Sequence, residues 1–229
     1  MSTNSRPPIF ILGNPRSGTT LLRLMLTCHR EIVAPPECGF AVWFYDKYRD
    51  WSRFRAAALT AAFIDDLLGA KKFDTWGVSK GQLTECFADR PPESYAEAAS
   101  RVYECYGRCR GRDFSRWGDK NNFHVDHVDT LDALFPEAFF VHIVRDGRNV
   151  ACSYKQLHAE AIASRYAPRL PWKIADVAGE WRANNDKIDA ALKALGRGRS
   201  HRLRFEDLIS DTEAVLRALC DALGETFDP

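Results

Sequence analysis

The 229-residue chain lacks several features that would each point to a particular class of protein. Its acidic and basic residues nearly cancel, leaving a net charge of +1, so no global field favours nucleic acid or a membrane surface as a partner. No apolar run approaches the roughly 18 residues that a membrane-spanning helix needs. Any anion that this protein binds must therefore be held by local basic sites.

Paired cysteines and a secretion signal are also missing. None of the seven cysteines belongs to a CxxC pair, and the closest spacing is Cys105 to Cys109. An odd number of cysteines without a regular framework indicates a reducing compartment. The N-terminal segment MSTNSRPP is polar and has no apolar stretch of signal-peptide length. We therefore expect a cytoplasmic protein that binds neither a membrane nor nucleic acid.

Strand-like and helix-like segments alternate along the chain. Strands are expected at 9–12, 32–34, 117–120, 139–144 and 202–205. Helices are expected at 19–28, about 39–68, 94–109, 125–135, 148–158, 172–195 and 211–223. This alternation predicts an α/β fold with βαβ units and a central, mostly parallel sheet of about five strands flanked by helices.

No internal repeat is present, and no Gly/Ser-rich or Pro-rich linker is long enough to separate two domains. The sequence therefore predicts a single domain over residues 1–229. Two polar segments, AKKFDTWGVSKGQ (70–82) and FADRPPESY (87–95), are interpreted as loops or a small inserted region.

The segment GNPRSGTT follows the first expected strand and precedes a helix. The spacing of Gly13 and Gly18 fits the Walker A pattern, which continues with Lys and then Ser or Thr. Here Thr19 stands in place of the Lys, and Thr20 meets the second requirement. Glycines let the backbone turn tightly and approach an anion, and a helix N-terminus offers free amides. Arg16 can add a charge-assisted fork. A plain turn is the alternative, but an anion-binding loop is favoured.

A second candidate site lies in FFVHIVRDGRNVACSY, residues 139–154. Arg145 follows a buried strand, so it stands at the carboxyl edge of the sheet, in the same crevice as the first loop. Ser153 comes eight residues later and can face back along the helix towards Arg145. The pair would make a second phosphate site. Alternatively, Arg145 pairs with Asp146 or caps a neighbouring carbonyl.

Taken together, PRSGTTLL and VRDGRNVACSY resemble the motifs of sulfotransferases that use 3′-phosphoadenosine 5′-phosphosulfate (PAPS). The pattern is most similar to tyrosylprotein and heparan-type enzymes and related bacterial ones, and it extends to RFEDL at 204–208. The resemblance implies a P-loop NTPase-like three-layer fold, PAPS as donor, the bisphosphate PAP as product, and no metal. It implies that Arg145 and Ser153 hold the 3′-phosphate. For the 5′-phosphosulfate it implies Arg16, Ser17, Gly18, Thr19 and Thr20, with Arg16 in place of the missing lysine.

The resemblance also implies a mechanism, in-line transfer of a sulfuryl group to a hydroxyl or amine. Glu37 in APPECGF resembles the glutamate that acts as general base, although an acid at a helix N-terminus is the alternative. Lys120 resembles the lysine that steadies the bridging oxygen. Asn122 stands where phenol-type enzymes place a histidine base, so their mechanism does not carry over. Asp119 and His124 are fallback bases, each otherwise a surface or capping residue.

The sequence departs from the family pattern in two places. Phe205 stands where the family has a cofactor-contacting tyrosine. The chain also ends at Pro229, where such enzymes often continue into a basic loop that clamps the cofactor. The basic run GRGRSHR (196–202) is one candidate for a substitute clamp, with a solvated loop as the simpler interpretation. The other alternative is that the C-terminal end is missing.

The acceptor is predicted only as a small molecule, a carbohydrate or a peptide. An aromatic-rich stretch after Glu37 either walls an acceptor pocket or fills the core. It comprises Trp43, Phe44, Tyr45, Tyr48, Trp51 and Phe54. Two other functions stay open: a degenerate P-loop kinase or nucleotide hydrolase, in which Asp146 imitates a metal-binding strand end, and a non-catalytic nucleotide-binding protein.

Overall fold

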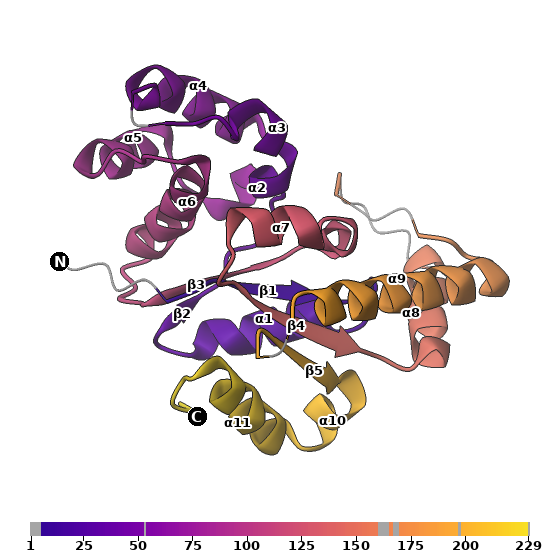
Figure 1. The fold of residues 1–229 in the computed structure, drawn as a ribbon. Helices are drawn as coiled ribbons and strands as arrows, with labels where there is room; N and C mark the ends of the chain where they lie inside the picture. Colours follow the sequence, from indigo (N-terminus) through magenta and orange to yellow (C-terminus); the bar gives the residue numbers. More distant parts are fainter. Residues whose placement is uncertain (1–5, 53, 160–164, 167–169, 197, 229) are drawn as a thin grey trace.

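Five parallel strands form the centre of the computed structural model, in the order β2-β3-β1-β4-β5 (Figure 1). The structure describes residues 6–52, 54–159, 165–166, 170–196 and 198–228. The strands are β1 (Ile9–Leu12), β2 (Ile32–Val33), β3 (Arg116–Lys120), β4 (Phe139–Val144) and β5 (Ser200–Arg204). The predicted α/β fold with a parallel sheet of five strands is confirmed.

Helices cover both faces of this sheet (Figure 1). They are α1 (Thr19–Cys28), α2 (Phe40–Trp43), α3 (Tyr45–Tyr48), α4 (Ala56–Gly69), α5 (Lys80–Asp89), α6 (Tyr95–Cys109), α7 (Val128–Leu134), α8 (Gly147–Ala159), α9 (Ile174–Ala194), α10 (Phe205–Ser210) and α11 (Thr212–Leu223). Two 3-10 turns, η1 (Phe73–Trp76) and η2 (Asn122–Asp126), complete the described elements.

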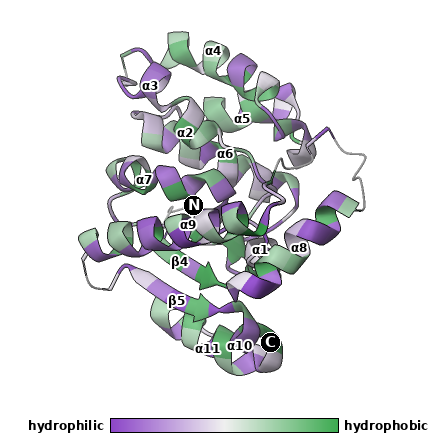
Figure 2. Cartoon of the chain, turned by 90° about the vertical axis from the view of Figure 1, so that its right-hand side faces the viewer, coloured by the Kyte–Doolittle hydropathy of each residue, from purple (hydrophilic) through white to green (hydrophobic). Residues whose placement is uncertain are grey.

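The side chains of β1 alternate between two hydrophobic clusters, as the pleat of a strand dictates. Phe10 and Leu12 pack in the cluster that includes residues of α7 and α9, whereas Ile9 and Ile11 pack with residues of α1, α10 and α11. A run buried on both faces is typical of a central parallel strand. Hydrophobic and hydrophilic residues alternate along α9, as expected of a helix that buries one face (Figure 2).

The region between β2 and β3 differs from the prediction. The helix expected over 39–68 is divided into α2, α3 and α4, because Trp51, between α3 and α4, turns into the core and donates its indole N–H to the carbonyl of Pro92. The two segments interpreted as loops hold η1 and much of α5. Helix α5 begins with a capping box between Ser79 and Gln82, a local start signal that the sequence itself carries.

An aromatic core joins these helices to the sheet. Tyr103 of α6 stacks on Trp117 of β3 with ring centroids 4.0 Å apart, and Phe40 of α2 contacts Trp76 of η1 at 5.8 Å. Aromatic pairs at such separations add to the free energy already gained by burial. We call the unit formed by α2–α6 and η1 the helical cap; it lies beyond α7 at one end of the molecule (Figure 1).

Within the described part of the chain, none of the helices is both long enough and apolar enough to cross a membrane.

Candidate active site

The loop between β1 and α1 has the tight backbone that its glycines predict. Gly18 adopts φ 90°, and a Cβ atom at this position would clash with the ring of Phe205. A Cβ atom at Gly13 would lie 2.7 Å from the carbonyl oxygen of Ile143 in β4. Both positions therefore require glycine, and the first amides of α1 are left open for an anion.

This loop is fixed by buried hydrogen bonds to α8 and α9. Asn14, which is fully buried, donates to the hydroxyl of Tyr154 at 3.1 Å and accepts from Asn184 at 2.8 Å. The Tyr154 hydroxyl in turn donates to Glu180 at 2.6 Å. The hydroxyl oxygen of Ser17 is buried and has no hydrogen-bond partner among the described residues. Such an orphaned group, beside the amides of α1, fits a loop built to receive an anion.

Three predicted anion-binding residues meet above this loop. Arg145 donates from Nη1 to the carbonyl oxygen of Arg16 at 3.0 Å, and Arg16 donates from Nε to the hydroxyl of Ser153 at 3.0 Å. The Arg145 guanidinium also lies over the ring of Phe205, 4.4 Å from its centroid. The Phe205 ring therefore packs against Gly18 of the predicted phosphosulfate site and Arg145 of the predicted 3′-phosphate site.

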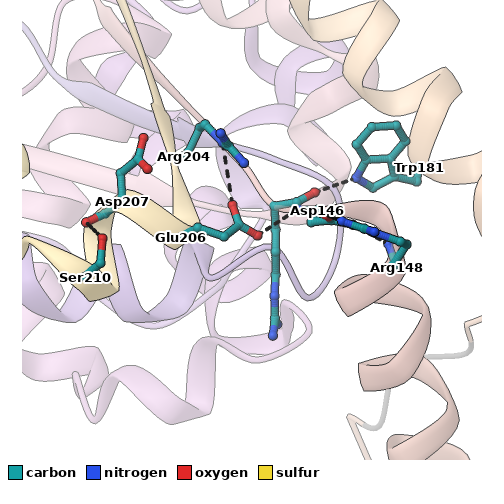
Figure 3. Close-up of polar contacts among 8 residues, drawn as sticks. Asp146, Arg148, Trp181, Arg204, Glu206, Asp207 and Ser210 are labelled. Atoms are coloured by element: carbon teal, nitrogen blue, oxygen red, sulfur yellow. Dashed lines mark hydrogen bonds and ion pairs between the residues drawn. The ribbon is translucent and has the colours of Figure 1, made fainter.

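Of the two predicted alternatives for Arg145, the pair with Asp146 is not observed, whereas a bond to a carbonyl oxygen, that of Arg16, is. Asp146 is bound instead by Arg148 at 2.6 Å, and the hydrogen bonds from Arg148 lower the pKa of Asp146 to about 2 (Figure 3). The same view shows the contacts that fix the end of β4. The backbone amide of Asp146 donates to Glu206 at 2.8 Å, and the indole of Trp181 donates to the carbonyl oxygen of Arg145 at 2.9 Å.

The motif RFEDL thus contributes Glu206 to the support of the β4 end and Phe205 to the packing of the loop. Residue 205, expected at the end of a strand, is instead the first residue of α10. The backbone of Arg204 is still extended, and helical geometry begins at the next residue.

Glu37 lies in the segment between β2 and α2, and its carboxylate is held between two ammonium groups. Lys120, at the carboxyl end of β3, donates to Oε1, and Lys72, just before η1, donates to Oε2. Burial alone would raise the pKa of Glu37, but the two lysines outweigh it and hold the pKa below its ordinary value. Burial also disfavours the charged form of Lys120 and so lowers its pKa, although the Glu37 carboxylate acts in the opposite direction.

The two fallback bases are neither surface nor capping residues, because both are fully buried. Asp119 accepts hydrogen bonds from the Tyr103 hydroxyl and the Asn121 amide, each at 2.8 Å. His124 Nε2 lies 3.5 Å from the Asp119 carboxylate. Burial raises the pKa of Asp119 to about 7 and lowers the pKa of His124 to about 3. These side chains belong to the core beneath Lys120.

A cavity of about 960 Å³ opens at this end of the sheet. Most of the predicted site residues line it: Arg16, Gly18, Thr19, Thr20, Glu37, Lys120 and Arg145. Ser17 and Ser153 are not among the described lining residues, although both adjoin it through the loop and Arg16. The cations around the cavity are Arg16, Lys71, Lys72, Lys120, Arg145 and Arg165, whereas Glu37 is the one acidic side chain among the described lining residues.

The aromatic-rich stretch divides between cavity and core. Tyr48 and Trp51 are buried in the helical cap, whereas Trp43 lines the cavity, is 42% exposed and stacks on Phe123 with centroids 5.4 Å apart. A Cβ atom at Gly39 would clash with both rings of this pair, so glycine there makes room for it. The sequence suggested Trp43 but not Phe123 or Lys72, since each reaches the cavity from a distant segment.

No described residue of the basic run 196–202 lines the cavity, and residue 197 lies outside the described residues. Arg199 instead pairs with Asp132 at 2.7 Å, and the run continues into β5. Among the described residues, no group of three or more His, Cys, Asp or Glu side chains is placed to hold a metal ion.

Comparison with known proteins places these features in a family. The chain matches the family model described as "Sulfotransferase family" over residues 7–229. Omega-hydroxy-beta-dihydromenaquinone-9 sulfotransferase Stf3 from Mycobacterium tuberculosis is 30% identical over 244 residues, covering 95% of this chain and 63% of that protein. Protein-tyrosine sulfotransferase A from Caenorhabditis elegans is 24% identical over 232 residues, covering 97% of this chain and 51% of that protein. The chain thus spans about half to two thirds of the length of these relatives.

Solved structures share the fold. The sulfotransferase domain of the Synechococcus PCC 7002 olefin synthase aligns with a TM-score of 0.64 at 24% identity, covering 99% of this chain and 76% of that one. The sulfotransferase domain from the curacin biosynthetic pathway aligns with a TM-score of 0.63 at 22% identity, covering 98% of this chain and 77% of that one. The predicted P-loop NTPase-like fold is confirmed, and because the family model matches almost the whole chain, this protein belongs to the sulfotransferase family.

Proposed function

We propose that this protein transfers a sulfuryl group from PAPS to a hydroxyl or amine of an acceptor, with Glu37 as the general base. The observation that carries the proposal is the pairing of Glu37 with Lys120 in the same cavity that the β1–α1 loop enters. A proton acceptor, a cation and an anion-binding loop are the three groups that transfer of an anionic group requires.

The residues present fit the donor. The buried Ser17 hydroxyl, the open amides of α1 and the Arg16 guanidinium would hold the 5′-phosphosulfate. Arg145 and Ser153 would hold the 3′-phosphate, and both already adjoin Arg16. When bound, PAPS supplies an activated sulfuryl group and a stable leaving group.

The chemistry assigned to the chain is a proton transfer and a charge stabilisation. Glu37 accepts the proton of the acceptor hydroxyl as the acceptor oxygen forms its bond to sulfur. The bond from sulfur to the 5′-phosphate oxygen breaks, and its electron pair leaves with PAP. Lys120 stabilises the charge that develops on that oxygen, and Arg16 and the loop amides stabilise the equatorial oxygens. In this proposal, Lys120 exchanges its bond to Glu37 for one to the donor when the donor binds, which frees Oε1.

For the acceptor, a small molecule, a carbohydrate or a peptide, the stacked pair Trp43 and Phe123 offers an aromatic wall beside Glu37. The names of two relatives refer to a hydroxylated dihydromenaquinone and to protein tyrosine, which both carry hydroxyl groups. We propose a hydroxyl acceptor on that basis. The single domain over 1–229 and the cytoplasmic location stay predictions.

Calorimetric titration of PAP without metal, beside ADP with Mg²⁺, tests the donor site. We expect clear preference for PAP. Preference for ADP with Mg²⁺ would overturn the proposal in favour of a P-loop kinase or nucleotide hydrolase. Tight PAP binding without sulfuryl transfer to any of a panel of phenols, sugars, peptides and alcohols would favour a non-catalytic nucleotide-binding protein.

A further inference from the structure

Lys72 donates a hydrogen bond to Oε2 of Glu37, the carboxylate oxygen that Lys120 does not contact. The side chain of Lys72 is 25% exposed and that of Lys120 only 3%, so the two ammonium groups approach from the open and the closed side of the cavity. Nothing in the family motifs accounts for Lys72. The sequence placed it in a loop, 35 residues from Glu37.

The backbone of Lys72 is in an unusual conformation. Among the described residues, two that are not glycine have positive φ, Arg16 at 68° and Lys72 at 71°. Both line the cavity. A side chain in the left-handed region strains the backbone, and such residues gather at functional sites because the surrounding structure holds them there.

Two buried anchors hold Lys72 in place. Phe73 and Trp76, in the turn η1 that follows it, are almost fully buried. The indole N–H of Trp76 donates to the carbonyl oxygen of Pro36 at 2.9 Å, so the turn that carries Lys72 is bonded to the residue before Glu37. A charged group mounted on a packed, hydrogen-bonded support is placed with little freedom.

We propose that Lys72 is a positioning residue for Glu37: it fixes Oε2, so that Oε1 is free to take the acceptor's proton once Lys120 has moved to the donor. This inference rests on the proposed function. Without Lys72, departure of Lys120 would leave a half-buried carboxylate that could rotate and that burial would drive towards its protonated, inactive form.

The other charged groups near Glu37 do not replace Lys72. Arg23 of α1 faces the same region but donates to the carbonyl oxygen of Ala34 at 2.8 Å. Asp119 and His124 lie beneath Lys120 in the core. Of the described residues, Lys72 and Lys120 are the ones that donate hydrogen bonds to the Glu37 carboxylate, so Lys72 alone stays when Lys120 leaves.

The test measures proton uptake when PAP binds, and it needs no acceptor. Calorimetric titration of PAP in two buffers of different ionisation enthalpy gives the number of protons taken up, between about pH 5 and 7. In Lys72→Met, which keeps the length and the backbone cost of the side chain, PAP draws Lys120 away and Glu37 loses its last cation. We expect up to about one more proton per PAP than in the wild type, because Glu37 then becomes protonated. Any change in the titration of the PAP phosphates persists in a variant that lacks the Glu37 carboxylate, so such a variant separates it from protonation of Glu37.

Three further proteins define the result. Lys72→Arg should restore the wild-type uptake, and the double variant Glu37→Gln, Lys72→Met should lose the extra proton. Lys80→Met removes an exposed lysine paired with Asp65 outside the cavity and should match the wild type. Equal uptake in Lys72→Met and wild type, no rescue by Lys72→Arg, or an extra proton that persists in the double variant would each overturn the positioning role. If the wild type does not bind PAP at all, the proposed function itself fails.

Discussion

The two sides of the cavity are built in different ways. On the donor side, the residues come from two short contiguous segments, the β1–α1 loop and the turn from β4 into α8. On the base side, Glu37, Lys72, and Lys120 with Phe123 come from three separate segments. The donor side depends on backbone conformation and amides, which a short motif can specify. The base side depends on how the helical cap packs against the sheet.

This difference separates the expected effects of substitutions. A change on the donor side should alter the binding of PAP and leave the proton transfer intact. A change on the base side should do the reverse. A substitution that affects both equally would show that the two sides are coupled more tightly than their construction suggests.

The largest effect is expected for Glu37→Gln, which removes the proposed proton acceptor on the base side. We expect kcat to fall by about 100-fold or more, the usual scale for a lost general base, while PAP still binds at least as tightly, because Lys120 no longer has to leave a carboxylate. Transfer rates with an acceptor identified by screening, beside PAP calorimetry, give both quantities. Glu213→Gln, at an exposed glutamate paired with Arg217, is the matched control. An unchanged rate would place the base elsewhere.

Arg145→Ala should act on the donor side alone. Hydrogen bonds to charged groups contribute about 1.5–3 kcal/mol, so we expect PAP to bind about 10- to 100-fold more weakly. AMP, which lacks the 3′-phosphate, should lose little affinity. Equal losses for PAP and AMP, measured by calorimetry, would contradict the assignment of Arg145 to the 3′-phosphate. Arg148→Ala removes the partner of Asp146 and controls for charge alone.

A third effect concerns stability at the buried end of the base side. The pKa of Asp119 is about 7 in the folded protein, against an ordinary value of 3.8 that applies to the unfolded chain. Between these values the folded state holds a proton that the unfolded state has lost, so this residue makes the free energy of unfolding fall as pH rises from about 4 to about 7. Asp119→Asn should remove that slope. Urea unfolding of both proteins at pH 4.5, 6 and 7.5 measures it, and parallel curves would refute the prediction.

The smallest effect is expected for Phe205→Tyr, which restores the hydroxyl that the family carries at this position. The ring already packs on Gly18 and Arg145, so the gain is at most one hydrogen bond. That is worth about 0.5–1.5 kcal/mol, or about two- to tenfold in PAP affinity. Phe54→Tyr, at a ring that is 86% exposed, should leave PAP binding unchanged. No gain in calorimetry would show that the hydroxyl has no partner here.

What could be predicted from the sequence follows the same division. The bounds of β1, α1 and β4 agree with prediction, because continuous apolar runs and the glycine at the start of α1 are local signals. The glycine-bearing loop was predicted for the same reason. Lys72 was not, because it meets Glu37 only through the packing of Trp76 against Pro36, and no local pattern encodes that contact.

The helical cap was the part predicted least well. The sequence predicted one long helix over about 39–68, whereas burial of Trp51 between α3 and α4 favours separate helices. Tertiary packing overrides helix propensity in such a region. The start of α5 is different, because its capping residues Ser79 and Gln82 were visible in the sequence.

The positive φ values of Arg16 and Lys72 also bear on how this protein responds to selection for heat resistance. At about 1–2 kcal/mol each, the two conformations take a sizeable share of the 5–15 kcal/mol or so that typically separates native from unfolded states. Glycine at either position would relieve the backbone but remove a guanidinium or an ammonium group from the cavity. A screen for thermostable variants would therefore favour, at these two residues, the substitutions that the proposed sulfuryl transfer can least tolerate.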